Sequence, residues 1–176
     1  MAFLLTLAFV SISFIIPTLK GAPWVPSSRE TIRRMLELAG IKPGEEVYDL
    51  GSGDGRIVIL SAREFGAKST GIEIDPFRAF YSRLMIKRLG LNGKARVICA
   101  SFFDVDLSMA DVVTMYLLQE TNDKLKPALE KELRPNCRVV SHVFKFDWEL
   151  IASDEDKKIY VYYPRPVVLK QTTSPD

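Results

Sequence analysis

The chain alternates between short apolar runs and longer stretches in which apolar residues recur every three or four positions. The short runs are typical of buried strands, and the longer stretches predict amphipathic helices. The predicted strands are residues 46–50, 68–74, 95–100, 111–118, 138–144, 149–152 and 157–163. The predicted helices are residues 56–65, 76–89 and 122–133, preceded by a helix that Ser27 or Ser28 caps and Gly40 ends.

Strands that are separated by helices form right-handed βαβ units, and such units build a parallel sheet. The last two strands differ, because the loop-forming residues 153–156 between them predict a β-hairpin. We therefore expect an α/β fold with a mostly parallel seven-stranded sheet and a C-terminal hairpin. This domain is expected to span residues 27–164, followed by a loose tail at 165–176.

Residues 1–19 stand apart because they include 14 apolar side chains and no charged one. As a helix they would extend about 28 Å, close to the thickness of a bilayer core. Basic residues follow from Lys20 onward, so we expect one N-terminal apolar helix at 1–20 that anchors the domain on the cytoplasmic or matrix-equivalent side. A signal peptide, a helix packed on the domain or a misassigned start are the alternatives. Residues 21–26 form a proline-rich joint.

Composition narrows the function classes. Apolar residues make up 47% of the 176 positions and charged residues 26%, which suits one packed domain. The net charge of +2 gives no support for nucleic-acid binding. Two distant cysteines, Cys99 and Cys137, and the single His142 match no metal-ligand spacing, so we expect no metal.

The candidate chemistry lies where the first strand ends. There Asp49 precedes Gly51, Ser52 and Gly53, and a helix follows. The glycine spacing, Gly-x-Gly-x-Gly, differs from the dinucleotide fingerprint, and Asp49 and Asp54 would repel a pyrophosphate. Two carboxylates suit a ligand with an ammonium or sulfonium cation, as at the methionine end of S-adenosylmethionine. An ordinary tight turn is the alternative interpretation.

Glu73, at the end of the second strand, strengthens the cofactor hypothesis because an acidic side chain there can accept hydrogen bonds from both ribose hydroxyls. With these residues, the chain resembles the class I, seven-β-strand S-adenosylmethionine-dependent methyltransferases, which have a Rossmann-like sandwich fold. Residues 23–27, 49–58, 112–118 and 138–142 make the resemblance narrower. They look like the archaeal protein lysine methyltransferases and the mitochondrial enzymes that modify the ATP synthase c-subunit and the adenine nucleotide translocase.

This resemblance implies transfer of methyl groups to lysine ε-amines of proteins. It places Asp49, Gly51 and Gly53, with Ser52 between them, at the methionine end of the cofactor. It also implies that Ser27 hydrogen-bonds the methionine carboxylate and that Glu73 hydrogen-bonds the ribose. The region of Ser101 and Phe102 is expected to lie beside the adenine. Ser101 is shorter than the Asp or Asn frequent there, and Trp24 replaces a frequent Tyr.

The exit of the fourth strand bears on the substrate. It reads Met115-Tyr116-Leu117-Leu118, without the Asn/Asp-Pro-Pro motif with which methyltransferases grip a planar amide or adenine amine. An aliphatic and aromatic slot suits the lysine stem, and a ring face can hold a methylammonium. We expect Trp24, Tyr116 and His142 to line this slot, although Tyr116 could merely pack the strand end and His142 could be structural.

Three functions remain open from the sequence. The first is a membrane-anchored, monomeric protein lysine methyltransferase that acts on proteins near the membrane and binds no nucleic acid. The second is a methyltransferase for a small molecule or lipid, an alternative that rests on the anchor alone. The third is a noncatalytic cofactor-binding module, which would not need Asp49 and Glu73 together.

Overall fold

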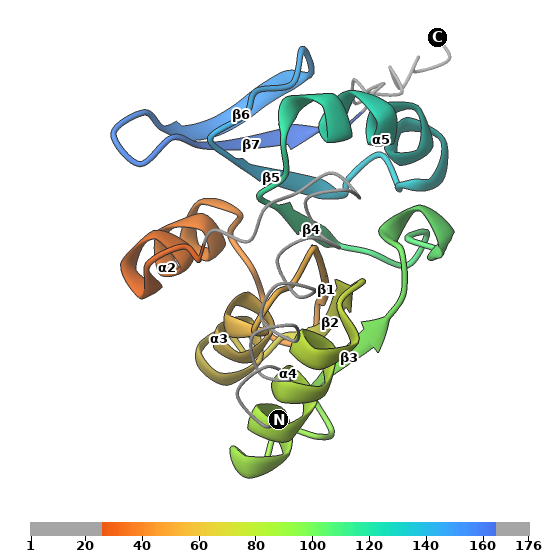
Figure 1. Ribbon diagram of the computed structural model, residues 1–176. Helices are drawn as coiled ribbons and strands as arrows, with labels where there is room; N and C mark the ends of the chain where they lie inside the picture. Colours follow the sequence, from red (N-terminus) through yellow and green to blue (C-terminus); the bar gives the residue numbers. More distant parts are fainter. Residues whose placement is uncertain (1–25, 165–176) are drawn as a thin grey trace, which may run out of the picture.

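The computed structural model of the protein describes residues 26–164. A seven-stranded sheet with the order β3-β2-β1-β4-β5-β7-β6 forms its centre (Figure 1). The strands are β1 (Glu46–Leu50), β2 (Lys68–Glu73), β3 (Ala95–Cys99), β4 (Val112–Met115), β5 (Arg138–His142), β6 (Glu149–Asp154) and β7 (Ile159–Tyr163). The first five strands are parallel, and β7 pairs antiparallel with both β5 and β6. The predicted mostly parallel sheet and C-terminal hairpin are confirmed.

Helices cover both faces of the sheet, with α2 and α3 on one side and α5 on the other (Figure 1). The helices are α2 (Arg29–Leu38), α3 (Arg56–Glu64), α4 (Pro76–Arg88), the 3-10 helix η1 (Phe102–Asp104) and α5 (Gln119–Glu132). Ser28 caps α2 by accepting a hydrogen bond from Thr31 N, and Asp75 caps α4 before a proline at its first position. α4 packs on β3 and β2, at the edge of the sheet farthest from β6.

Alternation along the strands divides the core between the two faces. Tyr48 and Leu50 belong to the cluster that α5 covers, whereas Val47 belongs to the cluster under α2 and α3. Successive side chains of a strand point to opposite faces, so one short strand supplies both cores. Both faces of the central strands β1, β4 and β5 are therefore buried, as in other parallel sheets.

Several predicted boundaries differ from the observed ones, and the largest differences, of three residues, lie at the end of β4 and the start of α5. β4 ends at Met115 instead of residue 118, and α5 begins at Gln119 instead of residue 122. The backbone leaves the ladder once its paired neighbours end, so the apolar residues 116–118 form a connection. In the hairpin, β6 continues to Asp154, because the ladder with β7 extends through the pair Asp154 and Ile159.

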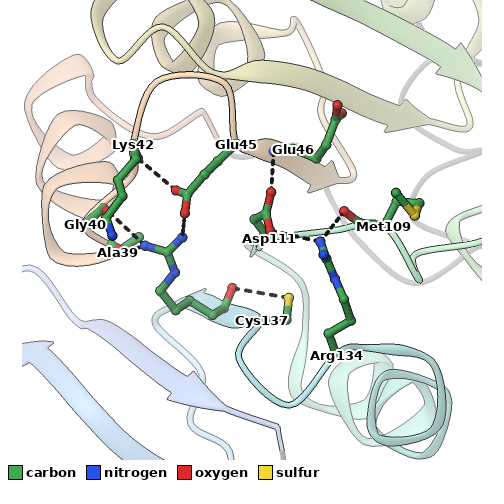
Figure 2. Close-up of polar contacts among 10 residues, drawn as sticks. Ala39, Gly40, Lys42, Glu45, Glu46, Met109, Asp111, Arg134 and Cys137 are labelled. Atoms are coloured by element: carbon green, nitrogen blue, oxygen red, sulfur yellow. Dashed lines mark hydrogen bonds and ion pairs between the residues drawn. The ribbon is translucent and has the colours of Figure 1, made fainter.

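The amino ends of the parallel strands carry a network of paired charges (Figure 2). The Arg138 guanidinium donates to Ala39 O and Gly40 O, at 2.5 and 2.8 Å, and to Glu45 Oε1 at 2.6 Å. One carboxylate oxygen of Asp111 accepts a hydrogen bond from Glu46 N, and the other accepts one from the Arg134 guanidinium, each at 2.9 Å. The network ties the start of β1 to those of β4 and β5.

Several expectations lie outside the described residues. These are the N-terminal apolar helix at 1–20, all but the last residue of the joint at 21–26, the tail at 165–176, and Trp24. Among the helices of residues 26–164, none is long and apolar enough to cross a membrane.

Candidate active site

The predicted site residues gather at the carboxyl ends of the parallel strands. Asp49 lies in β1, Glu73 ends β2, His142 ends β5, and Tyr116 follows β4. Because all four strands point the same way, these ends share one edge of the sheet, where ligands bind in open α/β folds. The sheet therefore brings together residues that are up to 93 positions apart in sequence, from Asp49 to His142.

The glycine-rich loop after β1 is held by its own backbone. Gly51 and Gly53 have φ angles of 77° and 57°, which few other residues adopt. The Gly51 and Ser52 amides both donate to Ile72 O, at 2.9 and 3.0 Å, and the Gly53 amide donates to Glu73 Oε2 at 2.7 Å. Loops that bind pyrophosphate present such amides to the phosphates, whereas here all three are already used. This geometry favours a cationic ligand group beside the loop.

The Ser52 side chain faces the sheet. Its hydroxyl is buried and has no hydrogen-bond partner among the described residues. A Cβ placed on Gly71 of β2 would lie 2.5 Å from Ser52 Oγ and 2.9 Å from Val58 Cγ2, too close for any side chain. Gly71 therefore lets the loop and α3 pack onto β2, and Ser52 shapes the site through its backbone.

Asp49 is the electrostatic centre of the site. Its side chain is buried, with the residue only 3% exposed, and it accepts a hydrogen bond from Thr114 Oγ1 at 2.8 Å. Burial raises the pKa of Asp49 to about 7, the Thr114 hydrogen bond opposes this rise, and the negative charges of Glu73 and Asp54 add to it. A cation beside Asp49 would stabilise its ionised form. This carboxylate therefore fits the ammonium or sulfonium end of S-adenosylmethionine.

Asp54 does not act as a second free carboxylate, contrary to our expectation. Arg56 pairs with it at 2.5 Å, so its charge is partly compensated within the protein. The same guanidinium donates to Ser27 O at 2.6 Å and so links the chain before α2 to the glycine-rich loop. Asp49 is thus the carboxylate of this loop without a cationic partner among the described residues.

Glu73 is positioned by two backbone amides. Its Oε2 accepts from Gly53 N and its Oε1 from Asp75 N at 2.8 Å, and the residue is 4% exposed. Each carboxylate oxygen has a second acceptor direction. The carboxylate is thereby held in one orientation and can still accept from the two hydroxyls of a ribose, as the sequence suggested.

The end of β3 places Ser101 and Phe102 at the same edge, since Ala100 N donates to Glu73 O at 3.1 Å. The Ser101 hydroxyl caps η1 by accepting from Phe103 N at 3.3 Å. Phe102 is partly buried against the core. A cap and a fixed ring at this position form a rigid wall beside Glu73.

Tyr116, His142 and Ser27 form a second cluster at this edge. The rings of Tyr116 and His142 lie 4.3 Å apart with an interplanar angle of 55°, and Ser27 Oγ lies 3.2 Å from His142 Nδ1. Burial lowers the pKa of His142 below its usual 6.5, so its imidazole is neutral near pH 7. The structure therefore brings together three of the predicted residues. Trp24 lies outside the described part of the chain.

Sequence reasoning missed two positioning residues. Thr114 was predicted only as part of a strand, yet it holds Asp49, and Arg56 pairs with Asp54. The register of β1 against β4, which pairs Asp49 with Thr114, would have exposed the first contact. Within residues 26–164, no group of three or more His, Cys, Asp or Glu residues could hold a metal ion.

Known proteins share this fold and sequence pattern. A protein-lysine N-methyltransferase of Saccharolobus islandicus is 48% identical over 70% of this chain and 77% of its own length. The mouse lysine N-methyltransferase of the ATP synthase c-subunit is 32% identical over 81% of this chain, and that match spans 58% of the mouse protein. An RNA methyltransferase of Salinibacter ruber, crystallised with S-adenosyl-L-homocysteine, superposes with a TM-score of 0.77 at 38% identity, covering 85% of this chain and 100% of the other.

The sheet order, the occupied loop amides and the buried Asp49 and Glu73 define a class I methyltransferase that uses S-adenosylmethionine. The family model described as the ANTKMT methyltransferase domain matches residues 49–151. The chain belongs to this family.

Proposed function

We propose that this protein transfers methyl groups from S-adenosylmethionine to lysine ε-amines of proteins. The observation that carries the proposal is the paired rings of Tyr116 and His142, which lie at the same edge of the sheet as Asp49. The protein-lysine methyltransferase that is 48% identical supports the same substrate class. An aromatic wall accommodates the apolar stem of lysine and attracts a methylated ammonium by cation–π interaction.

Methyl transfer requires a neutral amine, whereas a free lysine has a pKa near 10.4. A partly buried slot lowers that pKa, because burial disfavours the charged form. The neutral imidazole of His142 adds no positive charge that would compete with the substrate. We assign no residue as a dedicated general base, since holding the amine in line can supply most of the rate.

S-adenosylmethionine, when bound, supplies the electrophilic methyl group. Asp49 would face its cationic end and Glu73 its ribose, and both side chains are already oriented by protein donors. Ser27, Ser101 and Phe102 would complete the cofactor site, since they lie at the same edge of the sheet. The protein therefore contributes orientation and charge rather than a covalent intermediate.

An RNA substrate is the second candidate, because the Salinibacter ruber neighbour is described as an RNA methyltransferase. The exit of β4 favours lysine instead, because Met115-Tyr116-Leu117-Leu118 offers one hydroxyl and otherwise apolar side chains, with no amide to pair with a base. A small-molecule or lipid substrate and a noncatalytic role are the remaining candidate functions, and the experiment below tests the lysine substrate against each of them.

The experiment that tests the substrate uses the full chain, radiolabelled S-adenosylmethionine, and three separate acceptors: native membranes, soluble proteins and total RNA. Mass spectrometry then identifies the modified residue in any labelled protein. We expect label on lysine, lost in Glu73→Ala and strongly reduced in Tyr116→Ala, with Leu150→Ala as an active control on exposed β6. Label confined to RNA, or to lipid extracted from the membranes, would overturn the proposal, and so would the absence of label from every acceptor.

We further propose that residues 1–20 anchor a monomeric enzyme in a membrane, with the domain on the cytoplasmic or matrix-equivalent side. The uncharged length and the basic residues after it support this topology. Membrane proteins would then be the preferred substrates, because a short joint raises their effective concentration. Carbonate extraction tests the anchor, and release of the full chain into the supernatant would contradict it.

A further inference from the structure

One face of α4 leaves large apolar side chains in solvent. Phe80 is 66% exposed, Leu84 52% and Tyr81 51%. Their spacing of one, three and four residues places them on a single face of the helix. The opposite face packs on the sheet through three buried residues, Ala79, Ser82 and Ile86. An exposed cluster of this kind on a helix that is well packed elsewhere marks an interaction surface.

The charge around this face is positive. Residues 76–103 contain six Lys or Arg residues and no Asp or Glu. Lys87 and Arg88 are exposed in the last turn of α4, and Arg83 is exposed beside the apolar face while donating to Val97 O. Exposed aromatic side chains beside basic ones suit the interface of a bilayer, where rings enter the headgroup region and basic groups meet lipid phosphates.

A groove beside α4 extends the positive surface. It has a volume of about 350 Å³, and side chains from α2, α3 and α4 line it. Its four arginines are Arg29, Arg33, Arg56 and Arg63. Its two carboxylates, Asp54 and Glu64, pair with Arg56 and Arg33. The positive charges of the groove therefore outnumber its negative charges by two. Tyr81 and Met85 join this groove to the apolar face.

The described chain begins at the same place. Arg56, which lines the groove, donates to Ser27 O, so the start of the described chain is held at the groove. The uncharged residues 1–19 lie only a few residues further back along the sequence. A membrane segment attached here would bring this face of the domain toward the lipid.

We infer that the α4 face (Phe80, Tyr81, Leu84) and the arginine groove rest on an anionic phospholipid surface. The aromatic and aliphatic side chains enter the headgroup region, and the surplus arginines with Lys87 and Arg88 meet lipid phosphates. This inference goes beyond methyl transfer and uses the proposed anchor only for the direction of approach.

A protein segment folded onto the face is a poorer match. Residues 1–19 carry no charge, so they would cover the apolar side chains and leave the groove arginines without anions. The core of a protein interface is also depleted in charged residues, whereas here basic residues border the aromatic ones directly. An anionic lipid surface satisfies both features together.

The test compares two leucines of nearly equal exposure at opposite ends of the sheet (Figure 1), Leu84 on α4 at 52% and Leu150 on β6 at 49%. Each is changed to cysteine in the full chain with Cys99→Ser and labelled with an environment-sensitive dye; Cys137 is buried. The proteins are placed in nanodiscs of neutral phosphatidylcholine or of phosphatidylcholine with phosphatidylglycerol. Collisional quenchers on the acyl chains report depth.

In anionic discs we expect a blue shift and at least about twofold greater quenching at Leu84→Cys than at Leu150→Cys. Adding Lys87→Glu and Arg88→Glu should lower the ratio of affinities for anionic and neutral discs by at least about fivefold for each substituted residue. Equal quenching at both positions, or in both kinds of disc, would overturn the inference. So would a Leu84→Cys dye that is already shielded without lipid, which would point to a covering protein segment.

Failure of the proposed anchor is distinguishable from failure of this inference. Without a membrane-spanning segment, the protein would leave neutral discs but still associate with anionic ones, and salt would reverse that association. Methylation is measured separately, so loss of activity does not enter either readout.

Discussion

At the amino ends of the parallel strands, Asp111 accepts hydrogen bonds from a backbone amide and from Arg134 (Figure 2). At the carboxyl ends, Asp49 accepts a hydrogen bond from the Thr114 hydroxyl and has no cationic partner among the described residues. The first carboxylate is neutralised within the protein. The second is buried with a pKa raised to about 7. The same sheet thus has one end that is complete without a ligand and one end that is not.

This difference separates stability from function within one small domain. Paired charges at the amino ends hold β1, β4 and β5 in register, and removing one partner would leave the other without compensation. At the carboxyl ends, an unpaired buried carboxylate costs stability but attracts a cation. Substitutions at the two ends should therefore have opposite consequences.

The largest effect is expected for Asp49→Asn. The amide keeps an acceptor for Thr114 but loses the charge that faces the cofactor, so we expect affinity for S-adenosylmethionine to fall by about 100-fold. The protein without cofactor should become more stable at pH 8, by about 1–3 kcal/mol, because a buried charge is removed. Calorimetry and urea unfolding measure the two quantities. A variant that binds normally would show that Asp49 has no electrostatic role.

The second prediction concerns the amino ends. Arg138→Ala removes three hydrogen bonds to Ala39, Gly40 and Glu45, and we expect the free energy of unfolding to fall by about 2–3 kcal/mol. Affinity for the cofactor should be unchanged in the folded fraction. Lys145→Ala is the matched control, because its pair with Glu155 is exposed to solvent and should contribute little to the free energy of unfolding. Reduced cofactor affinity in folded Arg138→Ala would contradict the separation of the two ends.

The third prediction is a pH dependence that arises from Asp49. Its pKa is about 7 in the folded protein, against an ordinary value of 3.8, so folding favours the protonated form. This contribution to stability is complete below about pH 4 and is lost as the pH rises through 7. Cofactor affinity should change the other way and fall by about tenfold per pH unit below 7. Other carboxylates and His142 titrate in both proteins, so the contribution of Asp49 is the difference between the profiles of the unmodified protein and Asp49→Asn. Identical profiles in the two proteins would refute the assignment.

The smallest effect is expected at Val143. This β-branched residue follows His142 with a φ of 73°, and its amide donates to Lys158 O at 2.7 Å. Val143→Gly should relieve strain and raise the free energy of unfolding by about 1 kcal/mol or less. The turn after His142 would loosen, so we expect kcat to fall by about twofold. Lys158→Gly, with a φ of 52° in the facing segment, is the control that should leave kcat unchanged.

Much of this structure could be predicted because it depends on local patterns. The order of strands and helices follows from apolar periodicity, and the positions of Asp49, Gly51 and Glu73 follow from strand ends and glycine spacing. The end of β4 was harder, since residues 116–118 are apolar without being paired. Apolar character indicates burial, and it does not tell whether a neighbouring strand is present.

The long-range polar contacts could not be predicted. Arg138 reaches Glu45 across 93 positions, and Arg56 reaches Ser27 across 29. Such pairings depend on strand register and on the direction of long side chains, and neither of these produces a recognisable pattern in the sequence. The ion pair between Asp54 and Arg56 could not be predicted either, although the two residues are close in sequence, because it depends on the direction of the Arg56 side chain.

The tight contact between Gly71 and the loop also restricts how this sequence can evolve. An alanine at position 71 would collide with Ser52 and with Val58, which lie on different elements. Shrinking Ser52 to glycine would relieve only the first collision. An alanine at position 71 therefore requires both neighbours to move or to be replaced by smaller residues, and a replacement made beforehand would leave a void. Related sequences that depart from glycine at position 71 should accordingly differ at position 52 or 58 as well.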